Sequence, residues 1–507
     1  MTRYRHLITD DNRKWWTLGA MCFALFMVML DNTVVNVALP SIQRELHAHI
    51  SQLEWVINGY TLTFAVLIAT GGRLGDIFGR RLMFLTGVVI FAITSATAGL
   101  AQDSAMLIGS RAIQGIGAAL MMPATLSIIT HTFPAAERGR AIGIWAGVSA
   151  LALSIGPVVG GALTEYVSWR AIFFINLPVA VAAVAATVFA VRESRDETVD
   201  RHVDYPGIVA LTASLTAIIL ALIEGNSWGW GSTGIVSLLA GGVIGLAAFV
   251  AIELRVTSPM VEFALFRTRQ FIGSNLIAFI ITFAMMGTFF FMAIYMQDIL
   301  GFSALEAGVR FLPTTMVIAV VAPISGRLAD RLGPGVPMSA GLAVLAVSMF
   351  MFAGIDTGTT YAGLLIPFIL MGLGIALVMS PMSTAAMNAV SVQKSGVASG
   401  VLQMSRMVGA SVGVAATGAI FQAQLGSGFN PAALAAAPEQ ARATFVDALG
   451  SAMLLAAFVV VAGLVVSLLL IRRSRGGRVD THEAAEEAVE AIPVEAAVEE
   501  AVPVGAR

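Results

Sequence analysis

The stretch GRLGDIFG, Gly72–Gly79, returns as GRLADRLG at Gly326–Gly333, 254 residues further along the chain. Long apolar segments flank both copies. The repeat indicates two homologous halves arranged in parallel, an architecture that places any site between them, near the membrane midplane. We assign residues 1–195 to an N-terminal six-helix half, 196–264 to a two-helix insert, 265–475 to a C-terminal six-helix half and 476–507 to an acidic cytoplasmic tail.

The composition points to a membrane protein. Hydrophobic residues make up 57% of the 507 residues and charged residues 12%, whereas about a quarter of a soluble protein is charged. Such a chain cannot cover a soluble surface. Its fifty glycines are typical of closely packed membrane helices. A soluble enzyme, a nucleic-acid binder and a disordered scaffold are therefore excluded.

Fourteen apolar segments of about twenty residues predict an all-α polytopic protein with fourteen transmembrane helices. The segments are too long and too uniformly apolar for barrel strands. The first one is long enough to be a span rather than a cleavable leader. An even number of spans puts both termini on one side of the membrane.

The arginines and lysines predict which side that is. With these spans, 23 of the 29 fall on the side of the termini and three on the other, namely Arg44, Arg170 and Arg442. Positive charge gathers in cytoplasmic loops, so we expect both termini in the cytoplasm. The many arginines and alanines suggest a bacterial source, and hence the bacterial inner membrane. The tail is expected to be disordered, as a spacer or a regulatory segment.

Each copy of the repeated stretch is expected on a short link between the second and third helices of its half. Glycine permits a tight turn, and the aspartate can accept hydrogen bonds from helix N-termini or pair with arginines. A single copy could be a plain charged turn, whereas two copies favour a conformational latch. The latch residues are Gly72, Arg73, Asp76, Gly79, Arg80, Arg327 and Asp330.

Asp31 is the candidate proton site because a carboxylate inside a span is costly and usually functional. Counted from Pro40 and from Asp103, Asp31 and Arg111 lie at a similar depth, about 12–14 Å below the outer surface at 1.5 Å per residue. We expect them to pair and to carry proton coupling. The alternatives are a structural carboxylate and an arginine that caps loop carbonyls.

Other ionisable residues fall elsewhere in the spans. Arg406 lies near mid-membrane, where coupling and structural support are both open. Eight residues fall at span ends and are expected to be interfacial: Glu54, Glu165, Glu224, Glu253, Asp298, Glu306, Arg310 and Asp356.

Four motifs give the chain its resemblance to the major facilitator superfamily, and within it to the fourteen-helix drug:proton antiporters. They are LDNTVVNVALP at residues 30–40, the stretch at 72–81, RAIQGIG at 111–117, and Gly147 with GPVVGG at 156–161. The last resembles the antiporter motif of the fifth helix, with Gly147, Gly156, Pro157, Gly160 and Gly161. In the second half Val414 stands where Pro157 would map, so this motif occurs once. Its glycines also permit close helix approach.

A substrate cavity is expected to use polar and aromatic side chains from several spans. Aromatic faces suit lipophilic cations, although each ring alone is as readily explained by helix packing. The candidates are Asn32, Asn36, Tyr60, Gln114, Trp145, Phe283, Phe289, Tyr295 and Arg406.

These features predict a proton-coupled multidrug efflux transporter for lipophilic, cationic compounds, working by alternating access. The alternative is a dedicated exporter of one endogenous metabolite, an antibiotic or a siderophore. A membrane enzyme or sensor would need more catalytic groups at one depth. We expect a monomer in membrane lipid that binds small molecules and protons, with no nucleic acid, ATP, cofactor or metal, since no nucleotide loop or ligand cluster occurs in the sequence.

Overall fold

The computed structural model describes residues 12–195, 204–256, 259, 261, 263–390, 395–425 and 439–471. Fourteen of its helical spans are long and apolar enough to cross a membrane, and the described residues contain no strand. The expected number of spans and the all-α class are confirmed. The predicted acidic tail, 476–507, lies outside the described residues.

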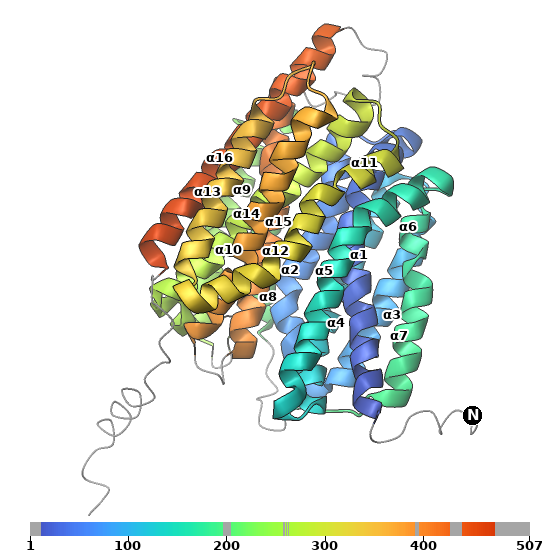
Figure 1. The fold of residues 1–507 in the computed structure, drawn as a ribbon, viewed down its shortest axis with the longest axis vertical. Coiled ribbons are helices and arrows are strands. Elements are labelled where there is room, and N and C mark those ends of the chain that lie inside the picture. Colours follow the sequence, from blue (N-terminus) through green and yellow to red (C-terminus); the bar gives the residue numbers. More distant parts are fainter. Residues whose placement is uncertain are drawn as a thin grey trace, which may run out of the picture.

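Figure 1 shows the helices in chain order, and we group them by the predicted halves and insert, a division that stays a prediction. The first half holds α1 (Arg13–Leu46), α2 (Ile50–Phe78), α3 (Arg80–Gly99), α4 (Ser104–Thr132), α5 (Ala135–Tyr166), α6 (Ala171–Phe174) and α7 (Asn176–Ala190). The insert is α8 (Tyr205–Trp228) and α9 (Thr233–Glu253). The second half holds α10 (Arg269–Ile294), α11 (Ala304–Arg310), α12 (Leu312–Leu332), α13 (Gly335–Ala353), α14 (Tyr361–Asn388), α15 (Ser395–Leu425) and α16 (Glu439–Leu470).

Two spans are broken rather than continuous. The sixth consists of α6 and α7, and the tenth of α11 and α12. Pro313 stands in the first turn of α12, where a helix does not need the N–H that proline lacks. We call the end of the bundle where α1 begins the N-side and the opposite end the far side. Both short helices lie at the far side (Figure 1).

The repeated stretch differs from its expected place on a link. Gly72–Phe78 forms the last turns of α2, and Gly326–Leu332 forms the last turns of α12. Only the final glycine of each copy makes the turn, with φ of 118° at Gly79 and 80° at Gly333. The residues before each of these glycines can all adopt helical φ and ψ angles. Each helix therefore continues until the glycine, whose positive φ ends it.

The first helix also continues past Pro40, its expected end, to Leu46. Proline removes the hydrogen bond that the Asn36 carbonyl would otherwise accept. Gln297 of the second half donates to the neighbouring Val37 carbonyl at 2.8 Å. The turn of α1 that precedes Pro40 therefore contacts the second half.

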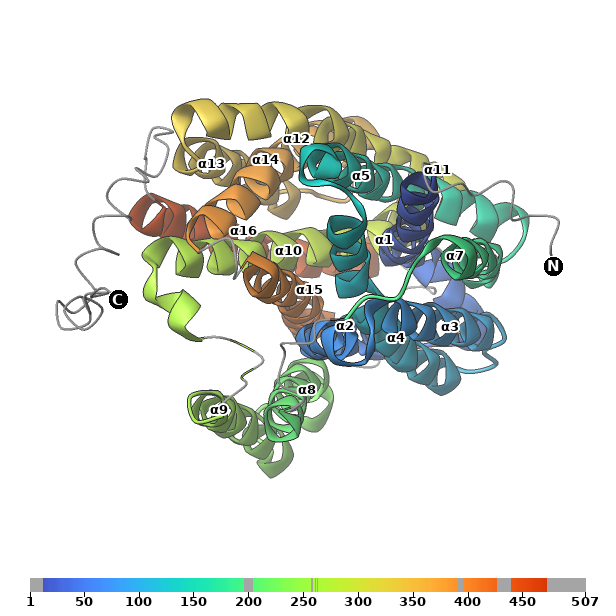
Figure 2. The ribbon, with the colours of Figure 1, turned by 90° about the horizontal axis from the view of Figure 1, so that it is seen from below.

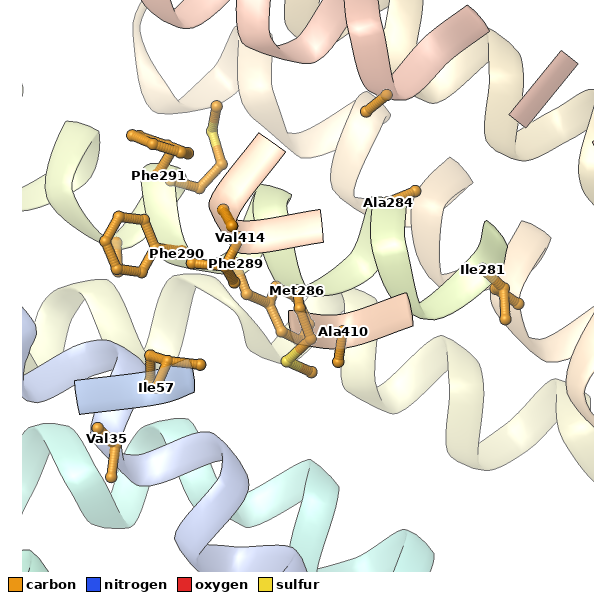
Figure 3. Packing of buried hydrophobic residues seen from close by; sticks show 14 of the residues in the cluster. Val35, Ile57, Ile281, Ala284, Met286, Phe289, Phe290, Phe291, Ala410 and Val414 are labelled. Carbon is orange, nitrogen blue, oxygen red and sulfur yellow. The ribbon is translucent and has the colours of Figure 1, made fainter. Parts of the chain in front are cut away.

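The two halves meet along two seams, α2 against α15 and α5 against α11 and α12. Buried side chains fill the space between them: Val35 and Ile57 of the first half face Met286 and Phe289 of the second (Figure 3). The insert lies outside this core, with α8 against α2 and α15 and α9 further out (Figure 2). Any site shared by the halves is thus formed without α9.

Candidate functional site

A buried ion pair lies inside the first half. Arg111 of α4 donates from its Nη1 to Oδ2 of Asp31 in α1 at 2.5 Å. Both residues are 1% exposed. Because α1 extends past Pro40, Asp31 is further from its helix end than expected, yet the predicted contact with Arg111 is present.

Three neutral side chains complete this site, which we call the Asp31 network. Gln114 donates to Oδ1 of Asp31 at 3.3 Å, and Asn176 donates to the same atom at 3.4 Å. Both also donate to Ser95, at 2.7 and 3.2 Å. All three are buried. The network therefore joins α1, α3, α4 and α7.

Arg111 is held on its other sides as well. Its Nε donates to the Val56 carbonyl at 3.1 Å, and its guanidinium lies 4.3 Å from the ring centre of Tyr60. A planar guanidinium suits this combination of a carboxylate, a carbonyl and an aromatic face. Tyr60 and Gln114, which the sequence suggested as cavity residues, are fully buried around the ion pair in this conformation.

The network satisfies a buried pair of opposite charges. Two charges inside an apolar bundle are stable only while they remain paired and hydrogen-bonded. Proton exchange at Asp31 stays a prediction. The sequence analysis missed Ser95 and Asn176 as partners; a single small polar residue in an apolar span was their only signal.

The glycines of α5 have two different environments. Gly156 and Gly160 pack on α1, where a side chain at Gly160 would come within 2.8 Å of the Val34 Cα. Gly161 packs on α11, where a side chain would come within 2.5 Å of the Ala304 carbonyl oxygen. A side chain at Gly308 of α11 would likewise overlap the Pro157 carbonyl oxygen. This part of the antiporter motif therefore forms the far-side seam.

Gly143 and Gly147 do not match the expectation of close packing. Nothing lies within 4 Å of a side-chain position at either residue. They occupy the N-side half of α5, where α5 and α12 diverge (Figure 1). The halves are therefore joined at the far side and apart along this stretch of α5.

Polar contacts at the far side join the halves. Arg44 pairs with Asp298 at 3.3 Å, and Glu165 accepts from the Leu305 amide at 2.9 Å. Asp298 and Gln297 lie on a π-helical turn, Tyr295–Ile299, that continues α10. This turn brings both side chains to α1.

The latch residues lie at the N-side ends of α2 and α12. Asp76 pairs with Arg80 of its own half at 2.9 Å. Arg327 and Asp330 are exposed, and Gly72 lies against Pro123. A link between the halves through Asp76 remains a prediction.

Glu193, which the sequence analysis did not single out, takes the role of capping α3. It accepts from the backbone amides of Arg81 and Leu82 at 3.0 and 3.1 Å. Its carboxylate lies beside Gly79, where a side chain would come within 2.7 Å of it. This explains why the turn needs a glycine for space as well as for its φ.

The remaining cavity candidates do not form one cluster. Asn32 and Asn36 donate to carbonyls of their own helix at 3.0 Å. Phe289 packs on Phe311 with ring centres 5.2 Å apart. Tyr295 points to the Asp356 carbonyl at 3.4 Å, within the second half.

Trp145 and Arg406 share a distinct feature. The indole Nε1 of Trp145 and the Nε of Arg406 are buried and have no hydrogen-bond partner among the described residues. Arg406 donates from Nη2 to Ser383 at 3.1 Å. Trp145 lies ten residues into α5 and Arg406 eleven into α15, about 15 Å from each N-side helix end at 1.5 Å per residue. The backbone of Phe283 in α10 approaches Gly413 of α15, and its ring centre lies 6.1 Å from that of Phe279.

Three of the acidic residues that were expected at the interface are buried instead. Glu54 is 0% exposed, Glu253 4% and Asp298 7%. Glu54 and Asp298 stand at far-side helix ends that meet the other half, whereas Glu253 ends α9 and accepts from the Val261 amide at 3.1 Å. A position at a span end therefore does not ensure solvent. The environment of Glu54 is described below.

Comparison with known proteins places the chain in a family. The model of the Major Facilitator Superfamily matches residues 21–414. The tetracenomycin C resistance and export protein of Streptomyces glaucescens is 37% identical over 82% of this chain and 78% of its own length. The multidrug resistance protein Stp of Mycobacterium tuberculosis is 34% identical, over 83% and 79%. The puromycin resistance protein pur8 of Streptomyces alboniger is 37% identical, over 83% and 86%.

Solved structures share the fold. A bacterial homolog of the human lysosomal transporter Spinster, in an inward-facing and unoccupied conformation, superposes with a TM-score of 0.65 and 18% identity. The match covers 91% of this chain and 97% of that one. With its fourteen spans, the chain belongs to the major facilitator superfamily and to its fourteen-helix drug:proton antiporter type.

Proposed function

We propose that this chain is an efflux transporter that expels lipophilic compounds by alternating access and is driven by the proton gradient through Asp31. The buried Asp31–Arg111 pair carries the proposal, because ionisable residues inside a membrane span are costly to keep and usually serve a substrate or proton pathway. The resistance and export functions named for the relatives support the direction of transport. No ATP, cofactor or enzymatic activity is part of this proposal.

We further propose that the N-side faces the cytoplasm of a bacterial inner membrane. The arginine and lysine bias of 23 to 3 supports this orientation. Contacts close the far side, whereas α5 faces open space at Gly143 and Gly147. The conformation is then inward-facing, and a single chain supplies both halves of the pathway.

Trp145 and Arg406 are the proposed substrate contacts. They come from opposite halves at a similar depth, and each has a buried donor for which the described residues provide no acceptor. A buried donor without a partner is costly, so a substrate with carbonyl, quinone or carboxylate oxygens would gain from binding there. The expected cationic character of the substrate stays a prediction that rests on aromatic faces alone.

The test is a susceptibility panel in an efflux-deficient bacterial host that expresses the chain, with and without a protonophore. The panel should include cationic dyes and acidic or quinone antibiotics at matched lipophilicity. We expect resistance to several compounds and its loss with the protonophore. Protection against one compound alone would favour a dedicated exporter, for which the relatives named after single antibiotics provide the precedent.

The variant Asp31→Asn tests the coupling site directly. The amide keeps the shape and can still accept from Arg111, so the protein should fold and bind substrate. It cannot exchange a proton, so protonophore-sensitive efflux in everted vesicles should be abolished. Thr212→Ala in the insert helix α8 is the control, since Thr212 donates to the Ile208 carbonyl of its own helix. Undiminished proton-driven efflux by Asp31→Asn would refute the assignment.

A further inference from the structure

Glu54 is a buried carboxylate outside the Asp31 network. It lies in the first turns of α2 on the far side, at the seam with α15, and is 0% exposed. Its Oε1 accepts from Nε2 of Gln422 in α15 at 2.8 Å. Its Oε2 is buried and has no hydrogen-bond partner among the described residues. One oxygen of the carboxylate thus has a hydrogen-bond donor among the described residues, and the other has none.

The seam around Glu54 is built to receive a side chain of this size. Gly418 of α15 lies against the carboxylate, and a side chain there would overlap it. Four residues from Glu54 along α2, Asn58 accepts from Ser411 of α15 at 2.6 Å. The two contacts use the same face of α2. Both therefore form when the halves close at the far side.

The insert seals the same position from outside. Asn226, near the end of α8, donates to the Ala419 carbonyl of α15 at 2.6 Å, one residue from Gly418. Figure 2 shows α8 beside α2 and α15. Glu224 of α8 interacts electrostatically with Glu54 and adds a second negative charge. Glu54 is therefore covered by a helix that carries another acid, rather than by water.

In the part of the chain that the structure describes, no lysine or arginine pairs with Glu54. The one charged residue of α15, Arg406, lies sixteen residues before Gln422, about 24 Å along the helix. Arg111 of α4 reaches α2 at the Val56 carbonyl and is paired with Asp31. The other buried acid at the far side among the described residues, Asp298, differs because Arg44 pairs with it. Burial of an uncompensated charge is far costlier than burial of the neutral acid.

We propose that Glu54 is a second proton-binding site, which takes up a proton from outside while the far-side seam is open and allows the seam to close once it is neutral. The proton enters and leaves on the same side, so Glu54 gates the seam and Asp31 carries the coupling proton. This inference rests on the proposed function, since it takes the far side to face outward and the halves to alternate.

The experiment measures the far-side distance between the halves as a function of pH. Spin labels are placed at Val167→Cys, after α5, and Ala423→Cys, on α15; both positions are exposed, and Cys22→Ala removes the one native cysteine. The full-length protein in nanodiscs is then measured by double electron–electron resonance. In otherwise unchanged protein, we expect the long-distance population to grow as the pH rises.

Glu54→Gln is neutral at every pH and keeps a partner for Gln422, so the short distance should dominate throughout and the pH-dependent shift should be lost. Asn58→Ala weakens the same seam without a titratable group, and Asp298→Asn removes the paired acid; both should retain the shift. If Glu54→Gln does not fold, Glu54→Ala removes the same charge and is expected to lose the shift as well.

The inference is overturned if the distance in unchanged protein ignores pH, if Glu54→Gln keeps the wild-type shift, or if Asp298→Asn loses it. Efflux with and without a protonophore separates this from failure of the proposed function. Proton-driven efflux together with an unaltered shift in Glu54→Gln removes only the role of Glu54. Efflux that ignores the protonophore removes proton coupling itself.

Discussion

Arg111 organises the first half through four kinds of partner: a carboxylate, a side-chain amide, a backbone carbonyl and an aromatic ring. It contacts Asp31, Gln114, Val56 and Tyr60. Each partner comes from α1, α2 or α4, so the guanidinium ties three helices together. A residue with so many buried contacts contributes to stability as well as to coupling.

Arg111→Ala leaves Asp31 buried without its cation, and we expect a loss of stability of about 3–5 kcal/mol together with a loss of efflux. Arg111→Lys keeps the charge but not the planar fork, so it should be a partial rescue of both. Thermal unfolding in detergent and efflux from proteoliposomes measure the two effects. Equal stability of Arg111→Ala and wild type would show that the pair is not structurally coupled.

At the scale of the element, α5 divides into a packed far-side half and an unpacked N-side half. Gly308 of α11 lies against the Pro157 backbone, whereas Gly147 faces open space. The same residue type therefore has different consequences at the two positions. This division is what a helix needs if it seals one side of the membrane at a time.

Gly308→Ala should destabilise the closed far side by about 1–3 kcal/mol, because the added methyl group overlaps backbone that cannot move aside. Gly147→Ala, the matched control, should leave this conformation unchanged. Accessibility of a cysteine at Val167 to a membrane-impermeant reagent measures far-side opening, with Cys22 replaced. Equal labelling of the two variants would contradict the division of α5.

The latch is a property of the end of α2. Asp76 is bonded to Arg80 in this conformation, and we expect it to contact the other half when the N-side closes. Asp76→Asn should therefore lower turnover more than substrate binding. Binding by fluorescence quenching and transport in proteoliposomes provide the comparison. Lost binding with normal residual turnover would mean that Asp76 has been misassigned.

At the scale of the whole molecule, the seams between the halves concentrate their polar contacts at the far side. Arg44 with Asp298, Gln297 with Val37 and Glu165 with Leu305 all cross there. None of these contacts is needed to hold either half together. They can break as a group when the halves rotate against each other.

A reversible cross-link across this end should stop transport. In protein without Cys22, the pair Arg44→Cys and Asp298→Cys should be bridged by a bifunctional methanethiosulfonate reagent, whose spacer replaces the long native side chains that meet at 3.3 Å. Efflux should fall to background and return with reductant, while each single cysteine variant stays active after the same treatment. Full activity of the cross-linked protein would exclude alternating access at this seam.

Several features follow from the sequence itself. The number of spans and the all-α class could be predicted, since bilayer thickness fixes helix length. The division into two halves rests on the internal repeat and stays a prediction. The contact between Asp31 and Arg111 could also be predicted, because two buried opposite charges at similar depth have few other partners. These properties depend on local composition and on the membrane as solvent.

Other features were decided by the tertiary structure. Glu54 and Asp298 stand at span ends in the sequence, yet they are buried because the other half, rather than water, covers them. Ser95 and Asn176 join the Asp31 network only because α3 and α7 pack beside α1 and α4. The glycines of α5 look alike in sequence but differ in packing. Such outcomes depend on which surfaces of distant helices meet, and hydrophobic periodicity within one helix carries no information about its partner.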